Sequence, residues 1–111
     1  MKKLFANYNF EFDKNEKKLL INYCKQALKQ IAGDKRLFAE ERAFNSIIEK
    51  LNSGTEIVKL TKDEKTRLTH QLEENVKFIN KSIEKAWFFQ KWLYKSMLTQ
   101  YNNLLDNHFR G

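Results

Sequence analysis

One group of side chains has the spacing of a metal site. His70, Glu73 and Glu74 lie three and four residues apart, which on a helix places one imidazole and two carboxylates on the same face. Helical bundles that bind two metal ions through carboxylates need such motifs on facing helices, and the sequence holds no second copy. A solvated polar face is therefore the preferred interpretation, and we expect no metal ion and no other cofactor.

The remaining candidates for catalysis are isolated. Cys24 is the single cysteine, so an internal disulfide is excluded, and its place on an apolar stripe is typical of a small buried side chain. His108 follows Asp106 and Asn107 near the end of the chain, where we expect a frayed polar turn. The sequence has no glycine-rich phosphate loop, no paired cysteines and no serine in a nucleophile elbow. We expect no enzymatic activity.

The segment from 77 to 97 carries the most informative pattern. On one continuous helix, side chains spaced three and four residues apart would form a row opposite the core stripe. We call this the basic aromatic row; its members are Lys77, Lys81, Lys85, Phe88, Trp92 and Lys95. Phe78 and Phe89 flank the same side, so the helix is apolar on two faces here.

Three interpretations of the basic aromatic row stay open. The first two helices could wrap around it and bury both faces. Alternatively, Phe88 and Trp92 could anchor a protein partner within a lysine rim, as in an interface hot spot. Lastly, the lysines could bind phosphates while the aromatic rings stack on bases. Arginines occur only at positions 36, 42, 67 and 110, outside the row, which disfavours base-specific recognition.

Composition sets the fold class. The chain has 111 residues, 41% of them hydrophobic and 14% aromatic, which suits one folded domain over residues 1–111. It has no proline and only two internal glycines, so we expect an all-α fold, a small bundle of three to four helices. The net charge of +7 excludes an acidic mimic of DNA. Apolar runs are too short to span a bilayer. We expect a cytoplasmic protein with no membrane partner.

A faint internal repeat locates two helix starts. At an offset of 48 residues, the segment 10–17 aligns with 58–65. Each copy has an apolar-polar-apolar triplet, then Asp13 or Thr61 as N-cap, then Glu16 or Glu64 to complete a capping box. The triplets predict a minor two-stranded ribbon that pairs residues 8–12 with 57–60.

Helices are expected at about 14–32, after Asp34 up to Gly54, and at 62–106. The last segment has an apolar stripe that keeps its phase throughout and is interrupted only at Gln90, which favours one long C-terminal helix. The members of this core stripe are Leu68, Leu72, Val76, Ile79, Ile83, Ala86, Leu93, Met97, Tyr101 and Leu104. At 1.5 Å per residue such a helix would be about 67 Å long, more than a domain of this size can cover. Either it bends near 80–82 or it packs on a second copy. A homodimer through this helix is slightly preferred.

The composition, rich in lysine, asparagine and phenylalanine, and the opening Val58-Lys59-Leu60-Thr61-Lys62-Asp63-Glu64 resemble small helical accessory proteins of phages and mobile elements in AT-rich bacteria. This resemblance implies a role in binding and regulating a host or element-encoded protein. The expected function is therefore that of a non-enzymatic regulatory or inhibitory protein, which binds a protein partner with an acidic surface. The alternative is a nucleic-acid-binding protein without sequence specificity.

Overall fold

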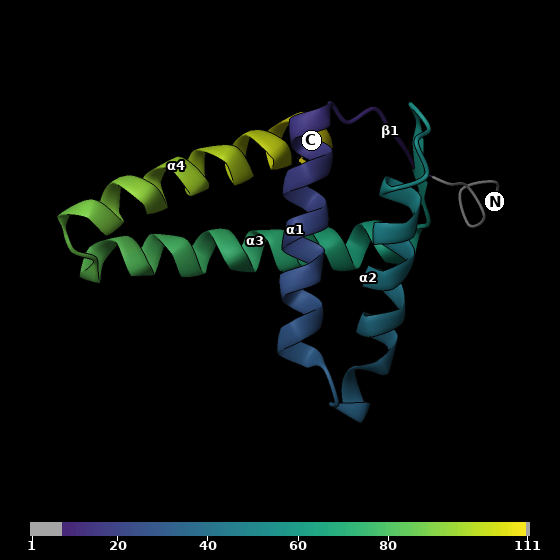
Figure 1. The fold of residues 1–111 in the computed structure, drawn as a ribbon, viewed down its shortest axis with the longest axis horizontal. Coiled ribbons are helices and arrows are strands. Elements are labelled where there is room, and N and C mark those ends of the chain that lie inside the picture. Colours follow the sequence, from purple (N-terminus) through teal and green to yellow (C-terminus); the bar gives the residue numbers. More distant parts are fainter. Residues whose placement is uncertain (1–7, 111) are drawn as a thin grey trace. The chain divides into compact units, whose positions relative to one another are not determined.

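The computed structural model describes residues 8–110, except for the side chains of Phe88 and Phe89. It consists of helices and one small sheet (Figure 1), which confirms an all-α fold with a minor ribbon. The elements are β1 (Tyr8–Phe10), α1 (Lys14–Ile31), the 3-10 turn η2 (Lys35–Leu37), α2 (Phe38–Leu51), β2 (Val58–Leu60), α3 (Lys62–Lys85), α4 (Phe88–Leu104) and the π-helical turn η3 (Leu105–Phe109). They form two compact units, divided within α3 between Arg67 and Leu68.

The predicted ribbon is present in the first unit. β1 and β2 are antiparallel, with Tyr8 opposite Leu60, Asn9 opposite Lys59 and Phe10 opposite Val58. Phe10, Val58 and Leu60 are buried, whereas Lys59 is exposed, so the alternation seen in the sequence separates an inner from an outer face. Each strand has three residues, which is shorter than the predicted segments 8–12 and 57–60.

Both predicted capping boxes are confirmed. The Glu16 backbone N–H donates to Asp13 Oδ1 at 2.7 Å, and the Asp13 N–H donates to Glu16 Oε1 at 3.0 Å. At α3 the Glu64 N–H donates to Thr61 Oγ1 at 3.1 Å, and the Thr61 N–H donates to Glu64 Oε1 at 2.9 Å. Each box satisfies two backbone donors that have no partner within the helix.

Replacing Thr61 with alanine is expected to lower the free energy of unfolding by about 0.5 to 2 kcal/mol, because the Glu64 N–H loses its acceptor. Chemical denaturation followed by circular dichroism measures the change. Thr61→Ser keeps the hydroxyl and serves as the control. An unchanged denaturation midpoint in Thr61→Ala would show that the cap contributes nothing to stability.

The connection from α1 to α2 follows the predicted stop and start signals. Gly33 has φ +83° and Gly54 φ +81°, the left-handed conformation that ends helices after α1 and α2. Asp34 Oδ1 accepts from the Arg36 N–H at 3.0 Å and also pairs with the Arg36 guanidinium. Asp34 therefore caps the 3-10 turn η2, and the α-helix itself begins only at Phe38.

The core of the first unit comes from both helices and from the ribbon. In Figure 1, α1 and α2 lie side by side and run in opposite directions. On α2 and just before it, Leu37 and Ile48 are only half-buried, whereas Ala43 and Ile47 are buried. The buried hydrophobic residues of this unit are Phe10, Phe12, Leu20, Tyr23, Cys24, Ala43, Phe44, Ile47, Leu51, Val58 and Leu60.

The expected continuous helix over 62–106 is wrong, because the chain breaks at Ala86 and Trp87. The Ala86 N–H donates to the carbonyl of Ile83 in a tight final turn, and Trp87 is extended, with φ −71° and ψ 164°. Gln90, the residue that interrupts the apolar stripe, accepts from the Trp87 N–H at 3.4 Å. The break lies beyond the predicted bend at 80–82, and α4 then turns back in the direction opposite to α3 (Figure 1).

The second unit is buried along α3 and at the end of α4. The residues of the stripe from 68 to 79 are buried as predicted, but Leu93 is exposed and Met97 half-buried. The buried residues of this unit are Leu68, Leu72, Val76, Ile79, Tyr101, Leu104, Leu105 and Phe109. The homodimer was predicted because one domain could not cover a continuous helix over 62–106. The break at Ala86 and Trp87 removes this argument for a dimer. The homodimer itself stays a prediction.

Candidate functional site

The break divides the basic aromatic row between two helices. Lys77, Lys81 and Lys85 are exposed on α3, whereas Trp92 and Lys95 are exposed on α4. The prediction that the row forms one face of a single helix is therefore wrong, because it required a helix that continues through Trp87. Phe88 begins α4, and its side chain lies outside the described residues.

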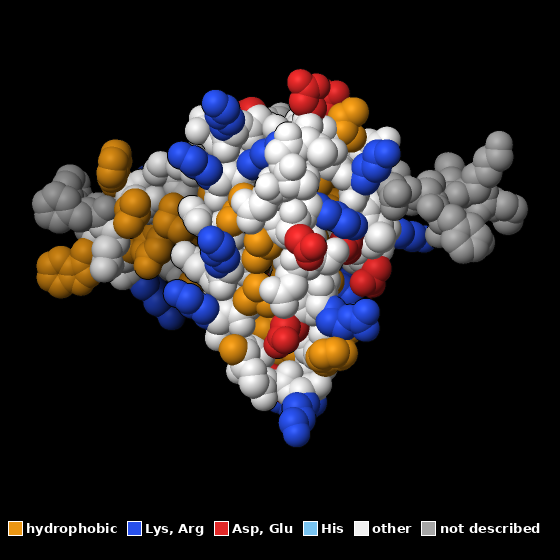
Figure 2. Space-filling model, turned by 45° about the vertical axis from the view of Figure 1, so that its right-hand side comes forward, with side chains coloured by type: hydrophobic (Ala, Val, Ile, Leu, Met, Phe, Trp, Pro, Cys, Tyr) orange, Lys and Arg blue, Asp and Glu red, His pale blue; other side chains and the backbone are white. Residues whose placement is uncertain are grey.

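The exposed large hydrophobic side chains described in the second unit lie before, within and after the turn from α3 to α4. The exposed fractions are 82% for Trp87, 75% for Trp92, 66% for Phe78 and 53% for Leu93. We call these four residues the aromatic tip. Figure 2 shows hydrophobic side chains gathered at this turn, at the left of the view. The interpretation of Trp92 as a core residue is wrong.

Trp87 and Leu93 were not predicted as site residues. Trp87 is exposed because it occupies the extended position between two helices, and no glycine or proline marks that turn in the sequence. Leu93 continues the core stripe of an uninterrupted helix, but α4 leaves it more than half exposed. The signal in the sequence was Gln90. It lies three residues after Trp87, the spacing at which a glutamine side chain can accept from the N-cap backbone of a new helix.

Lysines dominate the charges near the aromatic tip. Lys77 pairs with Glu74 across one helical turn at 3.2 Å. The other lysines of this stretch are exposed: Lys81, Lys85, Lys91 and Lys95. Glu84 is the only carboxylate between residues 77 and 105. The surroundings of the tip are therefore positively charged.

The side chains considered for catalysis stay apart. His70, Glu73 and Glu74 are exposed, and no three His, Cys, Asp or Glu side chains among the described residues form a group that could hold a metal ion. Cys24 is fully buried, and burial raises the pKa of its thiol to about 12. A thiol with such a pKa remains protonated at neutral pH and is a poor nucleophile.

The expected frayed turn at His108 is wrong. Residues 105–109 form a π-helical turn that the Arg110 N–H closes by donating to the Leu105 carbonyl at 2.7 Å. Phe109 is buried, and its ring contacts that of His108 edge to face. Burial of Phe109 anchors this end of the chain, and His108 is half-buried.

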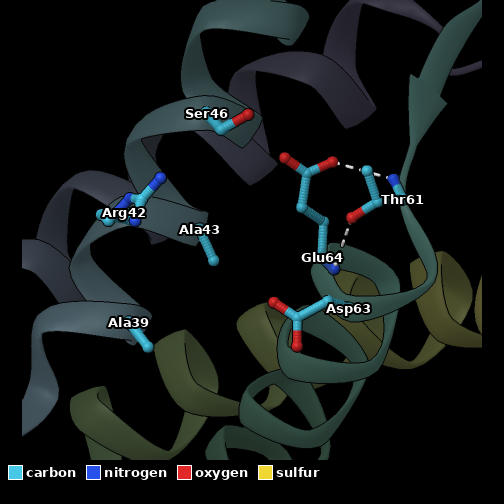
Figure 3. A pocket seen from close by; sticks show the side chains of 7 residues that line it. All are labelled: Ala39, Arg42, Ala43, Ser46, Thr61, Asp63 and Glu64. Atoms are coloured by element: carbon cyan, nitrogen blue, oxygen red, sulfur yellow. Dashed lines mark hydrogen bonds between the residues drawn. The ribbon is translucent and has the colours of Figure 1, made fainter.

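An open pocket in the first unit lies between α2 and the start of α3. Figure 3 shows Glu64 pointing across it toward α2, with Thr61 beside it. Its lining consists of Ala39, Arg42, Ala43, Ser46, Thr61, Asp63 and Glu64. Glu64 Oε1 accepts from Lys50 Nζ at 2.6 Å as well as from the Thr61 N–H. The carboxylate is thus engaged in capping and in an ion pair.

Two opposing effects set the pKa of Glu64. Burial raises it, whereas hydrogen bonds from Lys50, Ser46 and the Thr61 backbone, together with the positive charge of Lys50, lower it. The net result is a pKa below the ordinary value, so Glu64 is ionised at neutral pH. A carboxylate held in this form by three donors is suited to fixing the helix start rather than to accepting a proton from a substrate.

Comparisons with protein-family models, with curated proteins and with solved structures found no match to this chain. In the described part of the chain, no helix combines the length and the apolarity that crossing a bilayer requires.

Proposed function

We propose that this protein is a non-enzymatic regulator or inhibitor that acts by binding another protein through its aromatic tip. The observation that carries the proposal is the exposure of two tryptophans, Trp87 at 82% and Trp92 at 75%. Tryptophan is the residue type most enriched at interface hot spots. Exposing such large apolar surfaces to water is unfavourable, and a partner that covers them gains the corresponding free energy.

The charges around the tip define the partner further. Lys81, Lys85, Lys91 and Lys95 would form the charged rim of the interface, which favours a partner with carboxylates around an apolar pocket. The resemblance to accessory proteins of phages and mobile elements supports a host or element-encoded target in the cytoplasm. Such a protein needs no catalytic group of its own.

Trp87→Ala and Trp92→Ala, singly and combined, are expected to leave the free energy of unfolding nearly unchanged, because both side chains are exposed. Each should weaken partner binding by about 2 kcal/mol or more. Affinity capture from the host, with and without nuclease, followed by binding measurements on the captured protein, tests this. Phe38→Ala is the control, because Phe38 is 59% exposed in the first unit. A folded double variant that binds the partner normally would contradict the proposal.

Nucleic-acid binding at the tip is the competing outcome of the same experiment. Replacing Lys81, Lys85 and Lys95 with glutamine separates the two. A protein interface should lose mainly association rate, whereas a nucleic-acid site would lose affinity and salt dependence together, because fewer counterions are released. Capture that is lost both after nuclease treatment and in the Trp87→Ala, Trp92→Ala double variant would assign the tip to nucleic acid.

A further inference from the structure

The exposed side of α1 carries a second basic surface, which the proposed function does not use. Lys14, Lys18, Lys25 and Lys29 are all exposed. With 3.6 residues per turn, their positions fall within an arc of about 60° and extend over about 22 Å of the helix. We call these four residues the α1 lysine face.

Nothing in the described part of the chain neutralises the α1 lysine face. None of its four ammonium groups forms an ion pair with a described residue. Glu16 is the only carboxylate in α1, and it is engaged in the capping box with Asp13. By contrast, Lys50 and Arg67 pair with carboxylates in the same unit. The charges of the α1 lysine face therefore remain available to an external anion.

We infer that the α1 lysine face binds the phosphate backbone of double-stranded nucleic acid. Four ammonium groups held in a straight row by one helix match an extended, regular array of phosphates. Binding to single strands relies on aromatic rings that stack on bases, and the one aromatic residue of α1, Tyr23, is buried. The face has no arginine, so its contacts position the duplex without reading its sequence.

An acidic protein is a less suitable occupant of this face. Protein interfaces depend on large apolar anchors at their centre. None of the exposed large hydrophobic side chains among the described residues lies on α1. Charge without an apolar anchor suits a uniformly charged polyanion, and a nucleic-acid duplex presents that charge at fixed spacing.

The test measures binding of a labelled DNA duplex of about 20 base pairs by fluorescence anisotropy. The logarithm of the binding constant should fall linearly with the logarithm of the salt concentration. Four phosphate contacts predict a slope of about −3.6, hence roughly a hundredfold loss of affinity between about 50 and 200 mM salt. Replacing all four lysines of the α1 lysine face with glutamine should abolish most of this binding and its salt dependence. Circular dichroism verifies that the variant is folded.

The matched control removes the same number of charges from the second unit, through glutamine at Lys77, Lys81, Lys91 and Lys95. It should keep most of the duplex affinity. Equal losses of affinity in both variants would show that the duplex is attracted by net charge alone, and would overturn the inference. Absence of duplex binding by the wild type at low salt would also overturn it. So would a stronger affinity of the wild type for single-stranded DNA. The α1 variant should still capture the protein partner, and the tryptophan variants should still bind DNA, so failure of either proposal is distinguishable.

Discussion

Replacing Phe44 with alanine is expected to lower the free energy of unfolding by about 3 to 5 kcal/mol. Phe44 is 1% exposed and is among the largest fully buried side chains of the described residues. Its loss removes apolar surface from the core and leaves a cavity that the surrounding side chains fill only in part. Because small domains have only about 5 to 15 kcal/mol of stability in total, we expect a larger unfolded fraction of the variant than of the wild type at physiological temperature.

Phe38→Ala provides the comparison on the same helix. Phe38 is 59% exposed, and its ring lies 5.7 Å from the Arg42 guanidinium carbon, so its removal should cost no more than about 1 kcal/mol. Urea denaturation of both variants, followed by circular dichroism, measures the difference. Similar midpoints for the two variants would contradict the burial assigned to Phe44.

Glu64→Ala is expected to lower the free energy of unfolding by about 2 to 4 kcal/mol at neutral pH. The carboxylate caps α3 and accepts from Lys50 Nζ at 2.6 Å, and the loss of both a cap and a charge-assisted hydrogen bond accounts for this magnitude. Glu16→Ala is the matched control. Glu16 has the same role in the capping box of α1 but is more exposed than Glu64, so the effect should be about 1 kcal/mol.

The contribution of Glu64 to the free energy of unfolding should decrease as the pH is lowered. Because the pKa of Glu64 in the folded protein lies below its ordinary value of 4.5, folding favours the ionised form. The resulting stability is present above that value and is lost as the pH falls through the pKa of the folded state. The difference between wild type and Glu64→Ala, measured by urea denaturation, should therefore shrink below about pH 4.5. A constant difference down to pH 2 would contradict this assignment.

The features of the fold that depend on local rules could be predicted from the sequence. Asp13 and Thr61 start helices because a short polar side chain and a glutamate three residues later satisfy the same backbone donors in any fold. Gly33 and Gly54 lie in the turns that follow α1 and α2, where both take a positive φ. The ribbon was predictable because an alternating segment precedes each cap, although β1 covers Tyr8–Phe10 and shares only Phe10 with the triplet next to Asp13.

The break between α3 and α4 could not be predicted in the same way. Ala86 and Trp87 are both compatible with a helix, and the apolar stripe keeps its phase across them. Tyr101 and Leu104 near the end of α4 are buried in the fold that contains this break, and their burial depends on packing between residues that are far apart in the sequence. Such tertiary effects override local propensity and leave no pattern within a window of a few residues.

Only part of the candidate site was predicted, because its arrangement depends on the break between α3 and α4. Trp92 and the lysines at 77, 81, 85 and 95 are exposed as a binding surface requires, but they lie on two helices instead of one. Trp87, the most exposed of the large hydrophobic side chains that the structure describes, was missed because the assumed continuous helix gave it no special position. Its exposure follows from the backbone conformation at the turn.

The register of the ribbon pairs two positions that are equivalent in the internal repeat. Phe10 lies directly opposite Val58, and these two residues are also equivalent at the 48-residue offset. In an antiparallel pair, a residue that faces its own equivalent marks a two-fold axis through the ribbon, which is the geometry of an isologous homodimer contact. The observed pairs lie at and to one side of this position, at Phe10 with Val58, Asn9 with Lys59 and Tyr8 with Leu60, so the ribbon resembles such a contact at one pair of residues and departs from it beyond that pair.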